Sequence, residues 1–190
     1  DESGVIKYGR NYYDYQSGTM LFFAPRQVVC EEGGNAPNRG WVLFFHQDLL
    51  HGTPLGRNLG NYTFFQYAVN EALHLSDEER SIITGCFRNL LMELRHAMDD
   101  NSKTLIISNL ELLLNYSKRF YERQFITRSQ ANPDFLSRFE RILESYFNTG
   151  QLLQQGIPNV KYLADRMNLS ANYLSDMLRK HTGKSASEHI

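Results

Sequence analysis

The stretch LADRMNLSANYLSDMLRKHTGKSASEHI, residues 163–190, contains two short amphipathic segments that lie very close together. The first has apolar residues at helical spacing, and Asn168 after it tolerates the left-handed conformation that ends a helix. Ser170 is a strong N-cap for a second helix over residues 171–181. The buried side of that helix is expected to consist of Leu174, Met177 and Leu178. Two helices joined by so short a corner are typical of a helix-turn-helix motif.

The opposite side of the second helix carries polar and charged residues, also at helical spacing. In a helix-turn-helix protein this helix enters the major groove of DNA. Asn can pair with adenine there, Asp can accept from the cytosine amino group, and Arg and Lys suit the phosphates. The sequence therefore predicts six DNA-binding residues: Asn172, Ser175, Asp176, Arg179, Lys180 and Lys184. The alternative is a solvated face of an ordinary helical domain, because amphipathic helix pairs with short turns are common.

Two long helices are expected in the middle of the chain, over residues 77–98 and 103–125. The second has two apolar stripes, whereas a helix that is buried on one side needs only one. The extra stripe, with Leu105, Leu112 and Tyr116, requires another surface, either a sheet or a second copy of the chain. The residues predicted to mediate dimerisation are Ile106, Leu110, Leu113 and Phe120.

Short aromatic and branched runs near the N-terminus predict β-strands up to about residue 48. Two of them are GTMLFFAP at 18–25 and GWVLFFHQD at 40–48, each bounded by residues that break regular structure. Aromatic side chains of a small β-domain can line a pocket for a small-molecule effector. The predicted lining is Tyr13, Tyr15, Phe22, Trp41 and Phe45. The alternative is that these rings form the hydrophobic core.

The sequence carries no pattern that predicts catalysis. Ser, His and Asp are abundant, but no nucleophile, base and orienting group occur in a local signature. His46 and His51 lie near the end of an expected strand, and two histidines without a third ligand at fitting spacing do not predict a metal site. We therefore expect no enzyme activity, no cofactor and no bound metal.

Three features favour a cytoplasmic protein. Cys30 and Cys86 lie far apart without a metal-type spacing, which is typical of free thiols in a reducing compartment. No apolar run approaches the roughly 20 residues that a membrane span needs. No signal peptide opens the chain. The net charge of −1 is uninformative, and the basic bias of residues 160–190 is too weak to indicate nucleic acid by itself.

The sequence of residues 160–190 closely resembles the first helix-turn-helix of AraC-type bacterial transcription regulators. The matching residues are Leu163 and Ala164, Ser170, Tyr173 and Leu174, Arg179 and Lys180, and the run Thr182, Gly183, Lys184 and Ser185. Residues 40–56 and 108–125 resemble, more loosely, the sensor half of such regulators, a small cupin-like barrel followed by dimerisation helices. Family members carry a second helix-turn-helix and further strands, so the resemblance implies that this chain is a piece of a longer regulator.

Together these observations predict an α+β fold, with a partial cupin-like antiparallel β-domain followed by long helices and a C-terminal helix-turn-helix bundle. Residues 1–126 are expected to be a sensor and dimerisation domain, 127–134 a linker, and 135–190 a helical DNA-binding domain truncated after the helix-turn-helix at 159–182. The expected function is sequence-specific transcription regulation in response to a small-molecule effector. The expected partners are double-stranded DNA, a second copy of the chain and that effector, with RNA polymerase as a further candidate. Two alternatives are a cupin-type metal-dependent enzyme with a helical appendage and an oligomerisation module that does not bind DNA.

Overall fold

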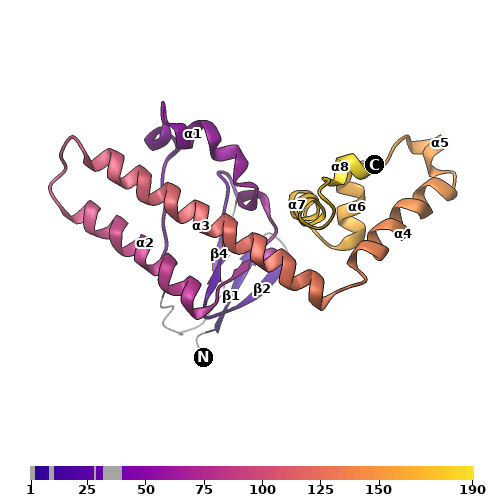
Figure 1. Ribbon diagram of the computed structural model, residues 1–190, viewed down its shortest axis with the longest axis horizontal. Helices are drawn as coiled ribbons and strands as arrows, with labels where there is room; N and C mark the ends of the chain where they lie inside the picture. The colour runs from indigo at the N-terminus through magenta and orange to yellow at the C-terminus, as the bar shows by residue number, and fades with distance from the viewer. Residues whose placement is uncertain (1–2, 9–10, 28, 32–39) are drawn as a thin grey trace. The chain divides into compact units, whose positions relative to one another are not determined.

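The computed structural model describes residues 3–8, 11–27, 29–31 and 40–190; in the three strands of the N-terminal sheet and at two positions near the end of one helix, only the backbone is described (Figure 1). The chain divides into two compact units. The first consists of Asp1–Leu21, Pro25–Tyr62 and Leu73–Phe120. The second consists of Phe22–Ala24, Thr63–Ala72 and Tyr121–Ile190.

The first unit contains short antiparallel strands. Strands β1 (Ser3–Tyr8), β2 (Asn11–Gln16) and β4 (Val29–Glu31) form a sheet in the order β2-β1-β4. Strands β3 (Thr19–Met20) and β5 (Leu73–His74) form a separate pair of two residues each.

The predicted α+β fold with a cupin-like β-domain is wrong, because the chain is mostly helical and its described strands do not form a barrel. The run at 40–48 contains no strand, and the run at 18–25 contributes only the two residues of β3. A strand forms only where a neighbour accepts its backbone hydrogen bonds, so apolar composition alone does not decide the outcome. The side chain of Trp41 instead stacks on Phe87 of a helix, with ring centroids 5.6 Å apart.

Helices make up about half of the described residues of the first unit. They are the 3₁₀ turns η1 (Gln47–Leu50) and η2 (Leu59–Asn61), the short α1 (Pro54–Asn58), the long α2 (Asp77–Arg95), and α3 (Ser102–Ala131) as far as Phe120. A capping box starts α2: the Ser76 hydroxyl accepts from the Glu79 N–H over 3.2 Å, and the Glu79 carboxylate accepts from the Ser76 N–H over 2.9 Å. Helix α2 ends three residues earlier than predicted, at Arg95.

Helix α3 is a single helix that continues beyond its predicted end at residue 125. It includes most of the segment 127–134 that was predicted to be a linker, so the chain leaves the helix only after Ala131. The division between the two compact units falls within α3, between Phe120 and Tyr121. The helix therefore contributes residues to both units.

The second unit combines the end of α3 with two 3₁₀ turns and five further helices. The turns are η3 (Thr63–Gln66) and η4 (Val69–Glu71), and the helices are α4 (Phe135–Asn148), α5 (Gln151–Gln155), α6 (Val160–Met167), α7 (Ala171–Thr182) and α8 (Ala186–His189). One side of α4 is buried, with the side chains of Phe135, Phe139 and Tyr146. No helix among the described residues is long and apolar enough to cross a membrane.

Candidate nucleic-acid interface

Local hydrogen bonds shape the corner between α6 and α7. Asn168 is left-handed, with φ of 59°, and the Leu169 N–H returns to the Ala164 carbonyl over 2.9 Å. The Ser170 hydroxyl accepts from the Tyr173 N–H over 3.3 Å and starts α7. These closures span only a few residues each, and they give the corner the caps predicted from the sequence.

The inner faces of α6 and α7 are packed together. Ala164 is buried, and its small side chain suits the close approach of a second helix. The caps and this packing hold the two helices as one rigid piece. The buried residues of the pair are Leu163, Ala164, Met167, Tyr173, Leu174, Met177 and Leu178.

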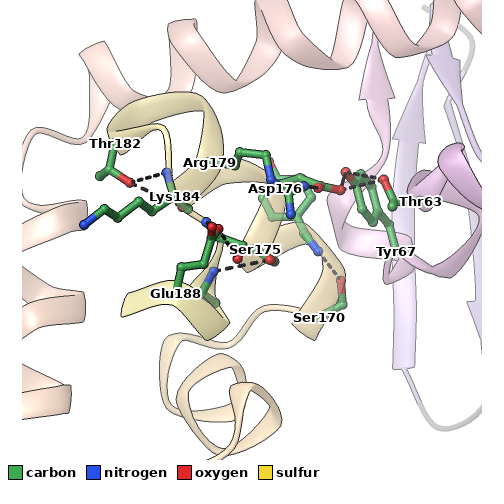
Figure 2. Close-up of polar contacts among 12 residues, drawn as sticks. Thr63, Tyr67, Ser170, Ser175, Asp176, Arg179, Thr182, Lys184 and Glu188 are labelled. Atoms are coloured by element: carbon green, nitrogen blue, oxygen red, sulfur yellow. Dashed lines mark hydrogen bonds and ion pairs between the residues drawn. The ribbon is translucent and has the colours of Figure 1, made fainter. Parts of the chain in front are cut away.

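The polar face of α7 contacts the chain itself, at residues 63–72 of the same compact unit, here named the 63–72 segment (Figure 2). The Thr63 hydroxyl donates to the Asp176 carboxylate over 2.5 Å, and the Tyr67 hydroxyl donates to the same oxygen over 2.8 Å. The Asn172 amide donates to the Gln66 side-chain oxygen over 2.5 Å. The Asp176 side chain is consequently only 16% exposed. Two residues predicted to read bases are thus hydrogen-bonded within the protein.

A buried carboxylate lies at the N-terminus of α7. Glu71 is 1% exposed, and it accepts from the Ser170 N–H over 2.6 Å and from the Ser170 hydroxyl over 2.5 Å. It also accepts from the Ala68 N–H within its own turn, over 2.6 Å. Burial raises the pKa of Glu71, although these hydrogen bonds and the charge of Arg128 act in the opposite direction. A negative group at a helix N-terminus is favourable, because the unpaired N–H groups there carry partial positive charge.

Aromatic rings join the 63–72 segment, the end of α3 and α7. Tyr67 meets Tyr173 edge-on, with ring centroids 5.1 Å apart, and Phe125 meets Tyr173 at 5.0 Å. Arg128 donates to the Tyr173 hydroxyl over 2.7 Å. Burial, and then the charge of Asp176, raises the pKa of the Tyr67 hydroxyl, which therefore stays protonated and can donate.

The basic residues of the predicted interface lie towards the C-terminal end of α7. Arg179 pairs with Asp176 over 3.0 Å, and Lys180 pairs with Glu122 of α3 over 3.2 Å. Lys184 is exposed, and the described residues offer its ammonium no ion pair. Ser175 differs from the others, because its hydroxyl accepts from the first backbone N–H of α8 over 3.3 Å.

The residues predicted to mediate dimerisation lie mostly in the core. Leu110, Leu113 and Phe120 are buried in the chain itself, and Ile106 is half-buried. Side chains already covered in this way are not available to a second copy. In the other stripe of α3, Leu105 and Leu112 are both nearly half exposed.

The residues predicted to line the effector pocket are divided between the two compact units. Phe22 belongs to the second unit, where its ring lies 4.4 Å from that of Phe64. Trp41 and Phe45 belong to the first unit, where Phe45 helps to line an apolar cavity of about 250 Å³. Tyr13 and Tyr15 lie in β2, outside the residues whose side chains are described.

The two histidines considered for metal binding are exposed in the structure. The His46 ring accepts from the Asp48 N–H over 3.3 Å, and His51 follows η1. Within the part of the chain that the structure describes, no group of three or more His, Cys, Asp or Glu side chains could hold a metal ion.

Sequence reasoning missed the residues that cover α7, namely Thr63, Gln66, Tyr67, Glu71 and Glu122. One signal pointed to Glu71, because it is the sole Asp, Glu, Lys or Arg in residues 58–76. A lone charge in such an apolar stretch is expected to have specific partners, since a buried charge without them is costly. No family model, no curated protein and no solved structure matches the chain. The site is therefore interpreted from its own geometry.

Proposed function

We propose that the protein is a sequence-specific DNA-binding transcription regulator in which α7 is the recognition helix. The observation that supports this most is the capped corner between α6 and α7, with Asn168 left-handed and Ser170 at the start of α7. In helix-turn-helix proteins such a corner presents the second helix to the major groove. The proposal assigns Asn172 and Asp176 to base edges and Arg179 to nearby phosphates.

The charge distribution on α7 fits this role. Arg179, Lys180 and Lys184 gather near the C-terminal end of the helix, where cations are also favoured by the helix dipole. All three are exposed and long enough to reach phosphates, which supply much of the affinity of such proteins. Ser175 lies towards α8 and has the weakest case among the six residues.

An effector and a second copy of the chain are further parts of the proposal. The effector would occupy the cavity of the first unit, whose lining includes Phe45, Leu90 and Leu110. A second copy would meet the exposed stripe of α3 at Leu105 and Leu112. RNA polymerase is a further candidate partner in this proposal.

A second candidate function is an oligomerisation module that does not bind DNA. The observation that favours it is the set of hydrogen bonds from Thr63, Gln66 and Tyr67 to the polar face of α7. In that case the face would be a permanent internal contact and would have no role in reading bases.

Selection from a pool of random-sequence duplex DNA separates the two candidates. A regulator should enrich a common sequence, and Arg179→Ala should weaken binding at low salt and reduce its salt dependence, because one phosphate contact fewer releases fewer counterions. Arg141→Ala is the matched control, since Arg141 is an exposed arginine on α4 outside the predicted interface. If the protein enriches no DNA sequence although the polar face of α7 is open to solvent, the result would favour the oligomerisation module.

A further inference from the structure

We propose that the 63–72 segment is an intramolecular inhibitor of DNA binding, which covers the reading face of α7 and must leave it before a duplex can bind. This inference rests on the proposed function, because it concerns the regulation of the same site. It identifies the occupant of that face as a part of this chain.

The 63–72 segment and a DNA duplex would compete for the same atoms of α7. One Asp176 carboxylate oxygen already accepts from Thr63 and Tyr67, and the Asn172 amide already donates to Gln66. A base edge in the major groove would need these groups within hydrogen-bond distance. A helix with a polypeptide turn against its outer face cannot also enter a groove that is only about 12 Å wide. The two arrangements therefore exclude each other.

Carboxylates of the chain bind groups of α7 that DNA phosphates would otherwise bind. A helix N-terminus with free N–H groups is a ready site for a phosphate, and lysines near the helix are others. In the structure the N-terminus of α7 is occupied by the Glu71 carboxylate, through the Ser170 N–H and hydroxyl. Lys180 is occupied by the Glu122 carboxylate. Two carboxylates from outside the helix-turn-helix thus take partners that the phosphates of a duplex would use.

The contact between α7 and the 63–72 segment can open while the pair of helices α6 and α7 stays intact. The Asn168 turn closes by hydrogen bonds within residues 164–169. The Ser170 hydroxyl donates to Glu71 but also accepts from the Tyr173 N–H, and that cap remains when Glu71 leaves. The contact with the segment is made largely by hydrogen bonds, which water or DNA can replace. Tyr173 is the exception, because it is buried against Tyr67 and Phe125. Opening the contact would expose the Tyr173 ring to water, which is unfavourable. The covered state would therefore stay more populated until DNA or an effector binds the open state.

The test uses the double variant Thr63→Val with Tyr67→Phe, which removes both hydroxyl donors to Asp176 and keeps the side-chain volumes. The matched control is Thr149→Val with Tyr162→Phe. It also removes one Thr and one Tyr hydroxyl, which donate to the Ser145 carbonyl and the Gln151 side-chain oxygen and lie away from α7. Binding is measured by fluorescence anisotropy with a short duplex of random sequence at low salt. The double variant should bind roughly five- to tenfold more tightly than the unaltered chain, since apparent affinity scales with the fraction that is open. The control should bind like the unaltered chain.

The outcomes distinguish the inference from the proposed function. Equal affinity of the double variant and the unaltered chain, with Arg179→Ala still weakening binding, would overturn the inhibitor and leave the DNA-binding regulator in place. Failure of every variant to bind any duplex would overturn the regulator itself.

Hydrogen exchange on the unaltered chain covers the case in which the double variant does not fold. Saturating duplex should speed exchange of the backbone amides in residues 63–72 and leave the amides inside α6 unchanged. Bound DNA with unchanged exchange in residues 63–72 would reject the inhibitor.

Discussion

The two faces of α7 are held by different forces. On the inner face Leu174, Met177 and Leu178 are buried beside α6, and each such side chain contributes about 1.5–3 kcal/mol through removal from water. On the outer face Asn172 and Asp176 are held by hydrogen bonds to the 63–72 segment. A hydrogen bond contributes about 1 kcal/mol net between neutral groups, as at Asn172, and about 1.5–3 kcal/mol to a charged group such as Asp176, and water or another polar partner can replace it when it breaks. The inner face is therefore a scaffold, and the outer face is a contact that can be exchanged for another partner.

The largest expected effect comes from the inner face. Leu174 is 0% exposed, so Leu174→Ala should lower the free energy of unfolding by about 2–5 kcal/mol, through lost burial and the cavity that remains. Urea denaturation measures this change. Leu153→Ala is the control, because Leu153 of α5 is 92% exposed and its change should stay within about 0.5 kcal/mol. Similar small changes for both variants would show that the inner face is not a packed scaffold.

A smaller loss is expected at the N-terminus of α7. Glu71→Ala leaves the Ser170 N–H and hydroxyl without their acceptor in a buried place, which should cost about 1–3 kcal/mol. Glu188→Ala is the matched variant, since Glu188 accepts from the Ser185 N–H and hydroxyl over 2.7 and 2.6 Å in the same way. Glu188 is exposed, so water replaces its bonds and the loss should be smaller. Equal losses in urea denaturation would contradict the buried role of Glu71.

The pH dependence of Glu71 is the next effect in size. Burial raises its folded-state pKa above the ordinary value of 4.5, so folding favours the protonated form. The stability that this group contributes is fully present below pH 4.5 and is lost as the pH rises through the raised pKa. The unfolding free energy of the unaltered chain, compared with that of Glu71→Gln, should therefore fall over this range. A difference that rises with pH would mean that the hydrogen bonds from Ser170 and Ala68 outweigh burial.

The inner face of α7 could be predicted from the sequence because its signals are local. Ser170 caps the N–H of Tyr173, three residues on, and Asn159 caps the N–H of Tyr162 in the same way. The start of α2 has the same kind of local signal, because the Ser76 hydroxyl accepts from the Glu79 N–H. Such pairs lie within one turn of a helix, so their spacing in the sequence is their spacing in space.

The cover on the outer face could not be predicted, because its partners are distant in the sequence. Thr63 and Asp176 are 113 positions apart. Helical spacing shows which residues share a face, and it does not show what lies against that face. Helical spacing was equally insufficient for α3. It predicted two apolar stripes on this helix, but it did not show that the stripe with Leu110 and Leu113 is the one buried in the core.

The predictions of a β-domain and of a linker were wrong for a different reason. They rested on amino-acid composition and did not consider which segments would accept the backbone hydrogen bonds. Residues 40–46 have strand-like composition but pair with none of the strands that the structure describes. Residues 127–131 are polar, yet they contain no Gly or Pro, and the Thr127 hydroxyl donates to the Arg123 carbonyl within the helix over 2.9 Å. A polar segment without a breaker can continue a helix that is already formed.

The smallest expected effect on stability is that of Arg179→Ala, at the edge of the outer face. Arg179 is 56% exposed, and an ion pair as exposed as this one contributes about 0–1 kcal/mol. Asp176 keeps Thr63 and Tyr67 as donors after the change, so urea denaturation should show little loss. Asp176→Asn, at a side chain only 16% exposed, should cost more, because both hydroxyls then lose a charged acceptor. If Arg179→Ala lowered the free energy of unfolding by more than Asp176→Asn does, Arg179 would be part of the packed structure that holds α7 in place. Its effect on DNA binding could then no longer be attributed to a phosphate contact, and the separation between the two faces of α7 would fail.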